Sequence, residues 1–520
     1  MDRNIAERLQ TAWTALRNRD LASAESIVTT LLAVLPNEPN ALYLAGSICS
    51  ARQQARRAVE FFKRAVAHAP DELQVRIALG RSLRKIDDDA GAIVALKRAT
   101  EIAPTSAGAW FELGKALKGD SRIDDARDAL EKALSLDPSL IAARGSLGDV
   151  YRSIGDVERA SANYRACLAD SFQAPRAWHR LANLKTVRLT ADDVNTLQSL
   201  YDSSTISDAD RIPIGYALMK ALEDQNRFDD AFDHLNAISR LQRARLKWDA
   251  AAFGETVTRI QTAFDDGDPE ESDFGAEAIF IVSMPRSGST LLEQMLGNHS
   301  SIASAGERSE IEFVLEEESR RRNLPFPQWM ATTTSDDWRR MGADYSQRMS
   351  RFHDGKPRFT DKGLNNWLYV GAAARMLPGA RFVDCRRDAL ETCLSCYRQL
   401  FSLGNAFSYH IDELAAYRRD YDRLSRFWNQ RYPDRVFALS YEGLTQSPDA
   451  QIRELLEFLG LPFENSVLDF HNSTRPVHTF SAAQVRQPLQ KDTARAKRYG
   501  RALDPLRAAL ARHASDRFDV

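Results

Sequence analysis

The first 175 residues carry a pattern of small, apolar and turn-forming positions that repeats every 34 residues. A regular step of this length marks a repeated supersecondary unit, in which small residues let two helices approach closely and proline ends the second helix. The pattern therefore predicts an all-α stack of helix–turn–helix units. The landmarks are the prolines Pro36, Pro70, Pro104 and Pro138, the glycines Gly46, Gly80, Gly114 and Gly148, the alanines Ala24, Ala58, Ala92, Ala126 and Ala160, and the larger residues Phe62, Leu96, Leu130 and Tyr164.

In its period and landmarks this pattern resembles the tetratricopeptide repeat. The resemblance implies about five units over residues 1–175, of which the first, from near Ile5, and the last, ending near Asp170, match less well. It also implies a superhelix whose concave groove binds a peptide or a protein, with a scaffold that binds no ligand as the alternative. Residues 176–270 are expected to form a helical extension, with a helical pair between Arg211 and Arg245 and a polar linker at 265–271.

Residues 271–520 contain four short apolar runs, at 279–282, 357–360, 380–385 and 435–440. Helical patterns separate these runs, so they predict an α/β domain with a central parallel sheet. Ligands of such sheets bind beyond the carboxyl ends of the strands. Each of the four runs is followed by polar or cationic residues, and we take this as one anion-binding site rather than four stretches of solvated surface.

The stretch that follows the first run has the layout of a phosphate cradle. Pro285 ends the run, Arg286 to Thr290 reads Arg-Ser-Gly-Ser-Thr, and a helical pattern begins at Leu291. Free backbone N–H groups at a helix N-terminus hold phosphate, and hydroxyl groups and an arginine add to them. A plain helix N-cap is the simpler alternative. A Walker-type nucleotide loop is the closer rival, but it requires a lysine where Ser289 stands.

A second anion site is predicted after the third run. Arg387 follows that run, and Ser395 lies eight residues later on a helix that begins near Ala389. A guanidinium and a hydroxyl at this spacing can converge on one phosphate. Arg386 competes with Arg387 for this role. Two anion sites about a hundred residues apart suggest a nucleotide that bears phosphates at both ends.

Composition and charge bear on which classes of protein the chain can belong to. The chain has 520 residues, enough for two or three domains, and its net charge of −2 argues against a nucleic-acid footprint over the whole chain. No apolar run is long enough to span a membrane and the N-terminus lacks the pattern of a signal peptide, so we expect a cytoplasmic protein. Five cysteines do not suggest a disulfide framework. Cys393 and Cys396 have a C-x-x-C spacing, but no second pair completes a zinc site.

The two phosphate segments, PRSGST after a strand and FVDCRRDALETCLS, resemble those of the sulfotransferases that use 3′-phosphoadenosine 5′-phosphosulfate (PAPS). The similarity covers roughly Ala278 to Tyr499 and is closest to the tyrosylprotein sulfotransferase branch, which has Gly-Glu some twenty residues after PRSG. Here that pair is Gly306-Glu307. This chain departs from the branch by an apparent insertion between His299 and Gly306, by Arg308 after Glu307, and by its repeats. We also expect no membrane anchor, in contrast to the animal enzymes of the branch.

The resemblance implies roles for individual residues. Glu307 matches the catalytic base and Lys362 the catalytic lysine, while His299 and Glu310 are alternatives for the base. Arg286 would stabilise the departing phosphate side together with Lys362. The residues that would hold the 5′-phosphosulfate are Arg286, Ser287, Gly288, Ser289 and Thr290; Arg387 and Ser395 would hold the 3′-phosphate, Tyr441 would lie along the nucleotide, and Ser481 and Arg486 would close over it.

These observations lead us to expect a PAPS-dependent sulfotransferase that needs no metal. The acceptor we expect is a protein tyrosine, held with help from the repeats. A sulfotransferase of small molecules or glycans, a phosphotransferase of the P-loop kind and a non-catalytic repeat adaptor are the alternatives. The oligomeric state and the partner of the repeats are left open.

Overall fold

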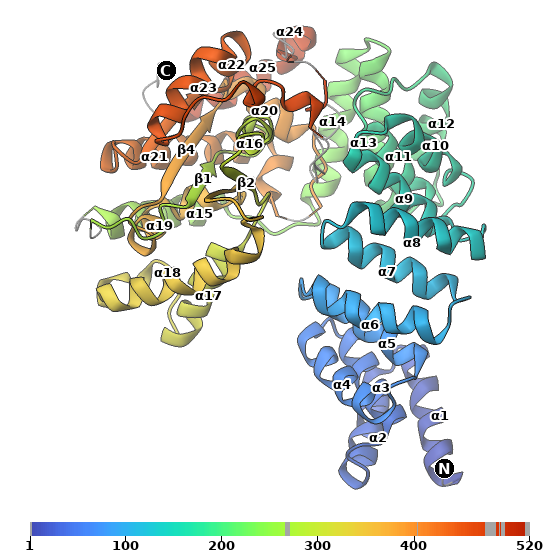
Figure 1. Cartoon of the computed structure of the whole chain (residues 1–520). Helices are drawn as coiled ribbons and strands as arrows, with labels where there is room; N and C mark the ends of the chain where they lie inside the picture. The colour runs from blue at the N-terminus through green and yellow to red at the C-terminus, as the bar shows by residue number, and fades with distance from the viewer. Residues whose placement is uncertain are drawn as a thin grey trace. The chain divides into compact units, whose positions relative to one another are not determined.

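The computed structural model of the chain describes residues 3–265, 271–402, 404–473, 485–487, 489 and 494–514. The chain forms two compact units, residues 1–177 and residues 178–520, and many of their helices and strands are labelled in Figure 1. The helical extension expected over 176–270 therefore lies, from Trp178 onward, in the same unit as the sheet.

The first unit is a series of paired helices, as the repeat predicts. Each pair corresponds to one 34-residue unit, with a short turn between its two helices. The pairs are α1 (Arg3–Arg17) with α2 (Leu21–Val34), α3 (Pro39–Ala51) with α4 (Ala55–His68), α5 (Leu73–Arg84) with α6 (Asp89–Ile102), α7 (Ala107–Gly119) with α8 (Ile123–Leu136), and α9 (Ile141–Ile154) with α10 (Val157–Ala166). A further helix, α11 (Ala174–Ala182), crosses the boundary between the two units.

The repeated glycines allow the two helices of a pair to touch. A Cβ placed on Gly46 would lie 2.5 Å from the ring of Phe62, and one on Gly148 would lie 2.5 Å from the ring of Tyr164. These separations are shorter than any real carbon contact, so only glycine fits opposite the large apolar residue. The repeated alanines Ala24, Ala58, Ala92, Ala126 and Ala160 are fully buried in the same seams.

The second unit opens with helices that precede the sheet. They are α12 (Ala191–Asp202), α13 (Asp208–Asp224), α14 (Phe228–Arg243) and α15 (Ala250–Phe264). The helical pair expected between Arg211 and Arg245 corresponds to α13 and α14. Most of the expected linker, residues 266–270, lies outside the described part of the chain.

A parallel sheet of five described strands forms the centre of the second unit, in the order β2-β3-β1-β4-β5. The strands are β1 (Ala278–Val282), β2 (Ile302–Ser304), β3 (Arg358–Asp361), β4 (Arg381–Arg386) and β5 (Val436–Ser440). Four of them confirm the predicted strands. The fifth, β2, was missed because three residues are too few to show a strand pattern. The neighbouring strands β1 and β4 bring their carboxyl ends to the same edge, since Val282 pairs with Asp384.

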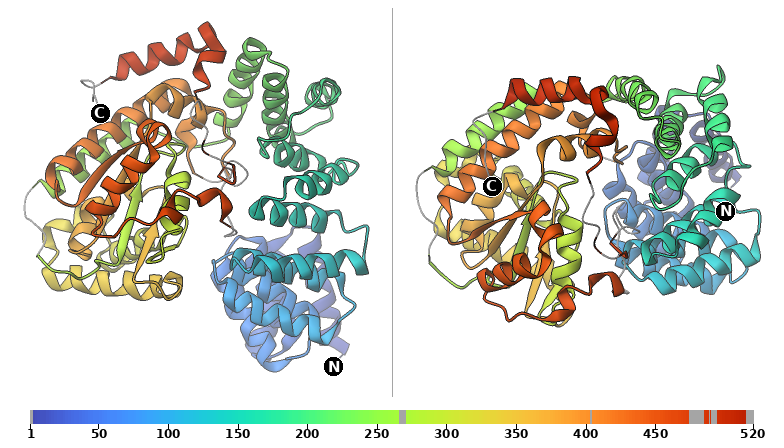
Figure 2. Two further views of the ribbon diagram at one scale, coloured as in Figure 1. Left: turned by 45° about the horizontal axis from the view of Figure 1, so that its top comes forward. Right: turned by 90° about the horizontal axis from the view of Figure 1, so that it is seen from above.

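Helices cover both faces of the sheet (Figure 2). Successive side chains of a strand point to opposite faces, so they pack against different helices. On one face Ile279, Ile281, Val383 and Cys385 pack with Leu292 and other apolar residues of the helix that follows β1. On the other face Phe280 of β1 stacks on Phe382 of β4, with ring centroids 5.3 Å apart. The remaining helices of the unit are α16 (Ser289–Gly297), α17 (Glu310–Arg322), α18 (Ser335–Met349), α19 (Val370–Met376), α20 (Ala389–Tyr397), α21 (Ile411–Arg431), α22 (Tyr441–Gln446), α23 (Pro448–Phe458), α24 (Ala496–Tyr499) and α25 (Asp504–His513), with short 3-10 turns between several of them.

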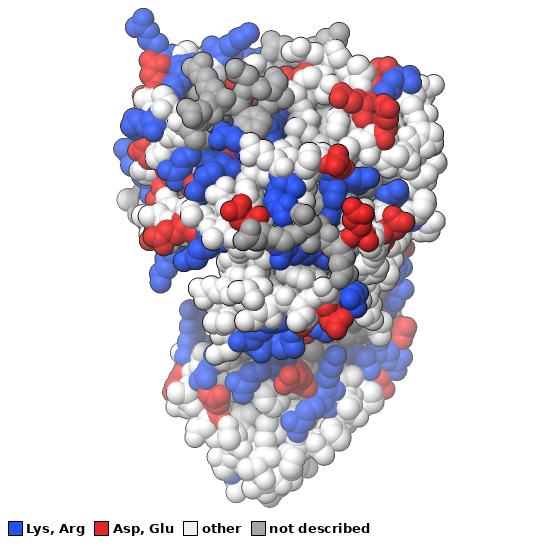
Figure 3. Space-filling view, turned by 90° about the vertical axis from the view of Figure 1, so that its left-hand side faces the viewer, with Lys and Arg blue, Asp and Glu red and all other residues white. Residues whose placement is uncertain are grey.

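The surface carries both signs of charge. On the face shown in Figure 3, lysine and arginine side chains are interspersed with aspartate and glutamate, as the net charge of −2 leads one to expect. Among the helices that the structure describes, none is both long and apolar enough to cross a membrane.

Candidate functional site

The loop between β1 and α16 has the backbone of an anion cradle. Arg286 has φ +71° and Gly288 has φ +98°, so two of its residues adopt the left-handed conformation that most side chains avoid. Ser289 and Thr290 form the first turn of α16, where an α-helix has no carbonyl partners for its N–H groups. A strained arginine beside a helix N-terminus is a combination found at ligand-binding loops.

Close packing against Tyr441 restricts the loop to glycine at one position. A Cβ on Gly288 would lie 2.1 Å from Cδ2 of Tyr441, which is the first residue of α22 and directly follows β5. The Tyr441 ring also lies against Arg387, whose guanidinium carbon is 4.7 Å from the ring centroid. Tyr441 therefore links the loop after β1 to the segment after β4.

The two predicted anion segments meet. Nε of Arg286 donates a hydrogen bond to Oγ of Ser395 on α20, at 3.1 Å. Burial lowers the pKa of Arg286, and the positive charges of Arg387 and Arg398 lower it further. Buried charges are screened by salt much less than exposed ones, so this repulsion acts on the buried guanidinium of Arg286. Arg286, Arg387 and Ser395 thus follow strands that end at the same edge of the sheet, and Ser395 contacts Arg286. The role of Ser395 at a 3′-phosphate stays a prediction.

Two buried cysteines donate hydrogen bonds to carbonyl groups of the same loop. Sγ of Cys396 donates to the carbonyl of Pro285 at 3.1 Å, and Sγ of Cys385 donates to the carbonyl of Ser287 at 3.4 Å. Burial raises the pKa of Cys396 and of Cys385, so both stay protonated donors at neutral pH. The second cysteine of the C-x-x-C pair is thus a support for the loop. Within the described residues, no group of three or more His, Cys, Asp or Glu side chains is arranged to hold a metal ion.

The two adjacent arginines after β4 face different environments. Arg386 is buried, donates from Nε to Asp384 at 2.8 Å and donates from Nη2 to Oγ of Ser425 at 2.8 Å. Arg387 instead pairs with Glu391 at 3.5 Å and stacks on Tyr441. Strand alternation explains the difference, since consecutive side chains point to opposite sides. Arg386 belongs to a core network, and the geometry favours Arg387 as the anion ligand.

The predicted base and the predicted lysine are in contact. Nζ of Lys362, at the end of β3, lies 3.1 Å from Oε1 of Glu307 and 3.7 Å from Oε2 of Glu293 on α16. The Lys362 side chain is only 3 % exposed, whereas that of Glu307 is 44 % exposed. Burial opposes the charge of Lys362, but Glu293 and Glu307 outweigh it and raise the pKa of the lysine. Sequence reasoning missed Glu293; its signal was an acidic residue at an inward-facing position of the helix after the loop.

The two alternative bases, His299 and Glu310, are buried and make other contacts. His299 is fully buried, with Nε2 2.9 Å from the carbonyl of Pro462 and Nδ1 accepting from the N–H of Ser301. It follows the C-terminal end of α16, the end opposite to the loop. Glu310 accepts from Arg351 at 3.3 Å. Both side chains are buried, whereas that of Glu307 is 44 % exposed, and the choice of Glu307 as the base stays a prediction.

Two predicted cofactor residues fall at the edge of the described chain. Ser481 lies outside the described residues. Arg486 donates from Nη1 to the carbonyl of Ser473 at 2.6 Å. Their expected place over the nucleotide stays a prediction.

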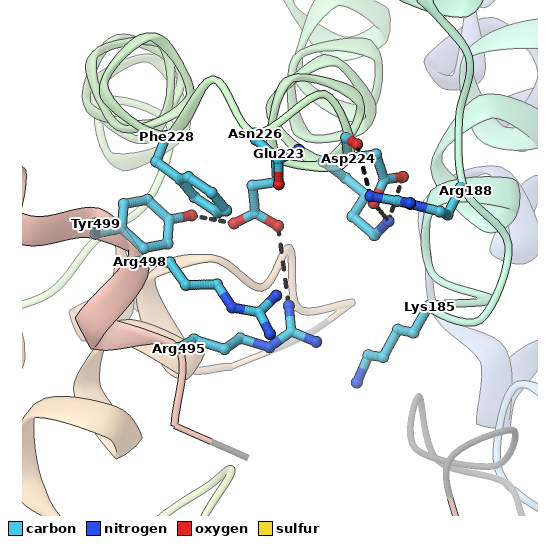
Figure 4. Close-up of a pocket in the computed structure, with 10 residues that line it drawn as sticks. Lys185, Arg188, Glu223, Asp224, Asn226, Phe228, Arg495, Arg498 and Tyr499 are labelled. Atoms are coloured by element: carbon cyan, nitrogen blue, oxygen red, sulfur yellow. Dashed lines mark hydrogen bonds and ion pairs between the residues drawn. The ribbon is translucent and has the colours of Figure 1, made fainter. Parts of the chain in front are cut away.

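The structure also contains a cationic pocket that sequence reasoning did not find. This pocket has a volume of about 270 Å³. In Figure 4 the side chains of Lys185 and Arg495 point toward the same open space from different segments of the unit. Arg398 and burial lower the pKa of Arg495 to about 10, because positive charge is crowded here. The charged residues that line the pocket are the cations Lys185, Arg188, Lys220, Arg495 and Arg498 and the carboxylates Glu223 and Asp224.

The pocket and the loop share an electrostatic environment. Arg398 pairs with the buried Glu223 of α13, and Tyr499 of α24 donates to the same carboxylate. The charge of Arg398 acts on both Arg286 and Arg495. The segment at Arg495 and Ala496 also contacts the residues around Arg387. Glu391, the partner of Arg387, accepts from the N–H groups of Arg495 at 3.0 Å and of Ala496 at 2.8 Å.

Both regions are similar to known proteins. Residues 278–465 match the model of the sulfotransferase family, and residues 107–140 and 141–169 match the tetratricopeptide repeat. An uncharacterised protein of Aquifex aeolicus (strain VF5) is 28 % identical over 399 residues, which are 74 % of this chain and 52 % of that protein, so the chain spans about half the length of this relative. A candidate protein-tyrosine sulfotransferase of Caenorhabditis briggsae is 22 % identical over 219 residues, 41 % of this chain and 78 % of that protein.

Among solved structures, a thermophilic tetratricopeptide-repeat protein of Thermus thermophilus aligns with 34 % of this chain and 98 % of its own, at 21 % identity and a TM-score of 0.30. The sulfotransferase match contains β1, the loop, Glu307, Lys362, Arg387 and Tyr441, while the pocket residues 185–228 and 495–499 lie outside it. Two regions of the chain therefore resemble known families, residues 107–169 the tetratricopeptide repeat and residues 278–465 the sulfotransferase family.

Proposed function

We propose that the second unit transfers a sulfuryl group from PAPS to a hydroxyl acceptor. The observation that carries the proposal is the meeting of Arg286 and Arg387, which are a hundred and one residues apart in the chain but share one edge of the sheet through Ser395 and Tyr441. Cations that are crowded together and repel one another favour a ligand that carries more than one negative group.

The residues present fit such a nucleotide. The first turn of α16 and Arg286 would hold the 5′-phosphosulfate, and Arg387 would hold the 3′-phosphate. Because Gly288 has no Cβ, the loop backbone can pack directly against the ring of Tyr441. PAPS supplies an activated sulfuryl group when it is bound.

The chain's own groups would then do three things. Glu307 would accept the proton of the acceptor hydroxyl as the acceptor oxygen bonds to sulfur. Lys362 and Arg286 would neutralise the charge that develops when the sulfur–oxygen bond to the phosphate breaks. The products are a sulfate ester and 3′-phosphoadenosine 5′-phosphate (PAP). Because the Glu307 side chain is 44 % exposed, it can turn from Lys362 toward an acceptor without leaving a buried carboxylate behind.

For the acceptor we propose a tyrosine of a polypeptide. The cationic pocket favours an acceptor with acidic groups near its hydroxyl, since its lining holds five cations and two carboxylates. A tyrosine phenol has an ordinary pKa near ~10, so it needs a base such as Glu307 at neutral pH. The repeats would hold a further part of the polypeptide, because stacked helical repeats present extended concave surfaces.

Transfer of labelled sulfate by the full chain tests the proposal. The protein would be incubated with sulfur-labelled PAPS and one of four acceptors: a tyrosine peptide flanked by acidic residues, the same peptide with phenylalanine in place of tyrosine, a small phenol and a glycan. We expect label on the tyrosine peptide and none on the phenylalanine control. Label on the phenol or glycan alone would overturn the acceptor assignment, and no transfer to any acceptor would overturn the sulfotransferase proposal.

A further inference from the structure

We propose that Glu293 is a positioning residue of the site: its buried carboxylate fixes the Gly306 backbone that carries Glu307 and is the permanent counter-charge of Lys362. The inference rests on the proposed function for its catalytic meaning. Its structural part stands on contacts that do not involve a ligand.

The position of Glu293 connects three segments. It lies on α16, one turn after Thr290, and its side chain is only 5 % exposed. Its Oε1 accepts from the N–H of Gly306 at 2.9 Å and from the hydroxyl of Thr360 at 3.3 Å, and its Oε2 faces Nζ of Lys362 at 3.7 Å. One carboxylate thus joins the helix after the loop, the segment after β2 and the end of β3.

The first consequence concerns the backbone of Gly306. This residue has φ +81° and directly precedes Glu307. Its N–H is held by Glu293, and its carbonyl accepts from the N–H of Lys362 at 3.1 Å. Fixing both polar groups of Gly306 fixes where the Glu307 side chain starts, which a base needs in order to meet the acceptor proton.

The second consequence concerns charge. A buried ammonium is stable only with a nearby counter-charge. Glu307 is exposed and must turn to the acceptor, so it cannot be the constant partner of Lys362 during the reaction. Glu293 is buried and has no such second task. Burial would lower the pKa of Lys362, and the charge of Glu293 is the largest of the contributions that raise it instead.

Further charged groups surround this cluster: the charge of Glu307 acts on Arg286, and Glu310 and Arg351 act on Arg308. Lys362 faces two carboxylates, that of Glu293 on α16 and that of Glu307 in the segment between β2 and α17. The charge of Glu293 also acts on Arg308, where it raises the pKa that burial lowers, and Nε of Arg308 donates to the carbonyl of Ala305. Asp361, next to Lys362, is buried and points to Tyr345 and Asn366 instead.

The test variant is Glu293→Gln, which keeps the shape and an acceptor oxygen for Gly306 but removes the charge. In the full chain with lysine-selective ¹³C labelling, the Lys362 signal is identified by its loss in Lys362→Arg and followed through a pH titration. We expect Lys362 to lose its proton at lower pH in Glu293→Gln than in the unaltered protein. Glu454→Gln, an exposed carboxylate on α23, is the matched control and should leave the titration unchanged.

The same variants are then compared in the transfer reaction. We expect the alkaline limb of the kcat profile to move to lower pH in Glu293→Gln while PAP affinity is kept. A Lys362 titration that coincides in the two proteins, or a kcat profile that does not move, would overturn the inference. If the unaltered chain transfers no sulfate, the proposed function is wrong. The lysine titration still decides in that case whether Glu293 is the counter-charge of Lys362.

If Glu293→Gln does not fold, a double-mutant cycle on unfolding with Glu293→Asp and Lys362→Met takes its place. A coupling between the two positions supports the inference, and additivity contradicts it.

Discussion

Three arginines from separate segments, Arg286, Arg387 and Arg398, lie close enough for their charges to interact. Arg398 forms an ion pair with the buried Glu223, and Arg387 lies 3.5 Å from Glu391 and against an aromatic ring. Nε of Arg286 bonds to a neutral serine. At the scale of single residues, positive charge is therefore concentrated where the two anion segments meet, and a bisphosphorylated nucleotide would relieve the repulsion between the arginines.

The role of Glu307 leads to a prediction at this scale. Glu307→Gln removes the base but not the contacts of the nucleotide loop, so we expect kcat to fall by about 10²–10⁴-fold with PAP affinity unchanged. Steady-state transfer kinetics and PAP titration measure the two quantities, with Glu316→Gln on the exposed side of α17 as the control. An unchanged kcat would show that another residue takes the proton.

At the scale of elements, the turn between β1 and α16 depends on one glycine. Gly288→Ala places a Cβ 2.1 Å from Tyr441 at a φ of +98°. The backbone strain alone costs about 1–2 kcal/mol, and the contact forces Tyr441 off Arg387. Gly355→Ala is the matched control, because it has φ +70° with no atom within 4 Å of the added Cβ.

We expect thermal unfolding to show a rise in Tm on addition of PAP for the unaltered protein and for Gly355→Ala, and little or no rise for Gly288→Ala. The two substitutions share the strain and differ in the contact with Tyr441. An equal PAP-induced rise in both variants would mean that the loop does not hold the nucleotide.

A second element-scale prediction concerns the helix pairs of the repeat. Gly114→Ala on α7 would place a Cβ 2.6 Å from Cγ of Leu130 on α8, whereas Gly108→Ala on the same helix meets no atom within 4 Å. Overpacking costs about 1–3 kcal/mol, against a helix-propensity gain of about 1 kcal/mol for replacing glycine. We expect urea unfolding to show Gly114→Ala less stable by about 1 kcal/mol and Gly108→Ala more stable. The reverse order would argue against close packing in the pairs.

The elements differ in how far the sequence predicted them. The sequence predicted the repeat because packing imposes glycine and alanine at the same positions of successive helix pairs. It predicted β1, β3, β4 and β5 because each is a short apolar run. The strand β2 was too short to show. In the site, Arg286, Arg387, Glu307 and Lys362 follow motifs or strand ends, but Glu293 and the cationic pocket arise from tertiary contacts between segments, which one-dimensional spacing does not encode.

At the scale of the whole molecule, the chain combines a unit of paired helices with a unit that contains the region similar to the sulfotransferase family. In the proposed function the repeats hold a polypeptide acceptor while the second unit modifies it. Linking two binding modules makes the second binding event intramolecular, with effective concentrations in the mM range for short flexible linkers. A weak local affinity for the tyrosine segment would then suffice for transfer.

The central claim is that the second unit binds the 5′-phosphate and the 3′-phosphate of one nucleotide. Calorimetric titration of the full chain tests this claim most directly. The ligands are PAP, adenosine 5′-phosphate and ATP with Mg²⁺, applied to the unaltered protein, to Arg387→Ala and to the control Arg453→Ala, which removes an exposed arginine of α23. Loss of a hydrogen bond to a charged group costs about 1.5–3 kcal/mol, or about 10–150-fold in affinity.

We predict that the unaltered protein and Arg453→Ala bind PAP more tightly than adenosine 5′-phosphate by about this factor, and that Arg387→Ala loses the difference. Tighter binding of ATP with Mg²⁺ than of PAP, or an Arg387→Ala protein that keeps the full preference for the 3′-phosphate, would contradict the account.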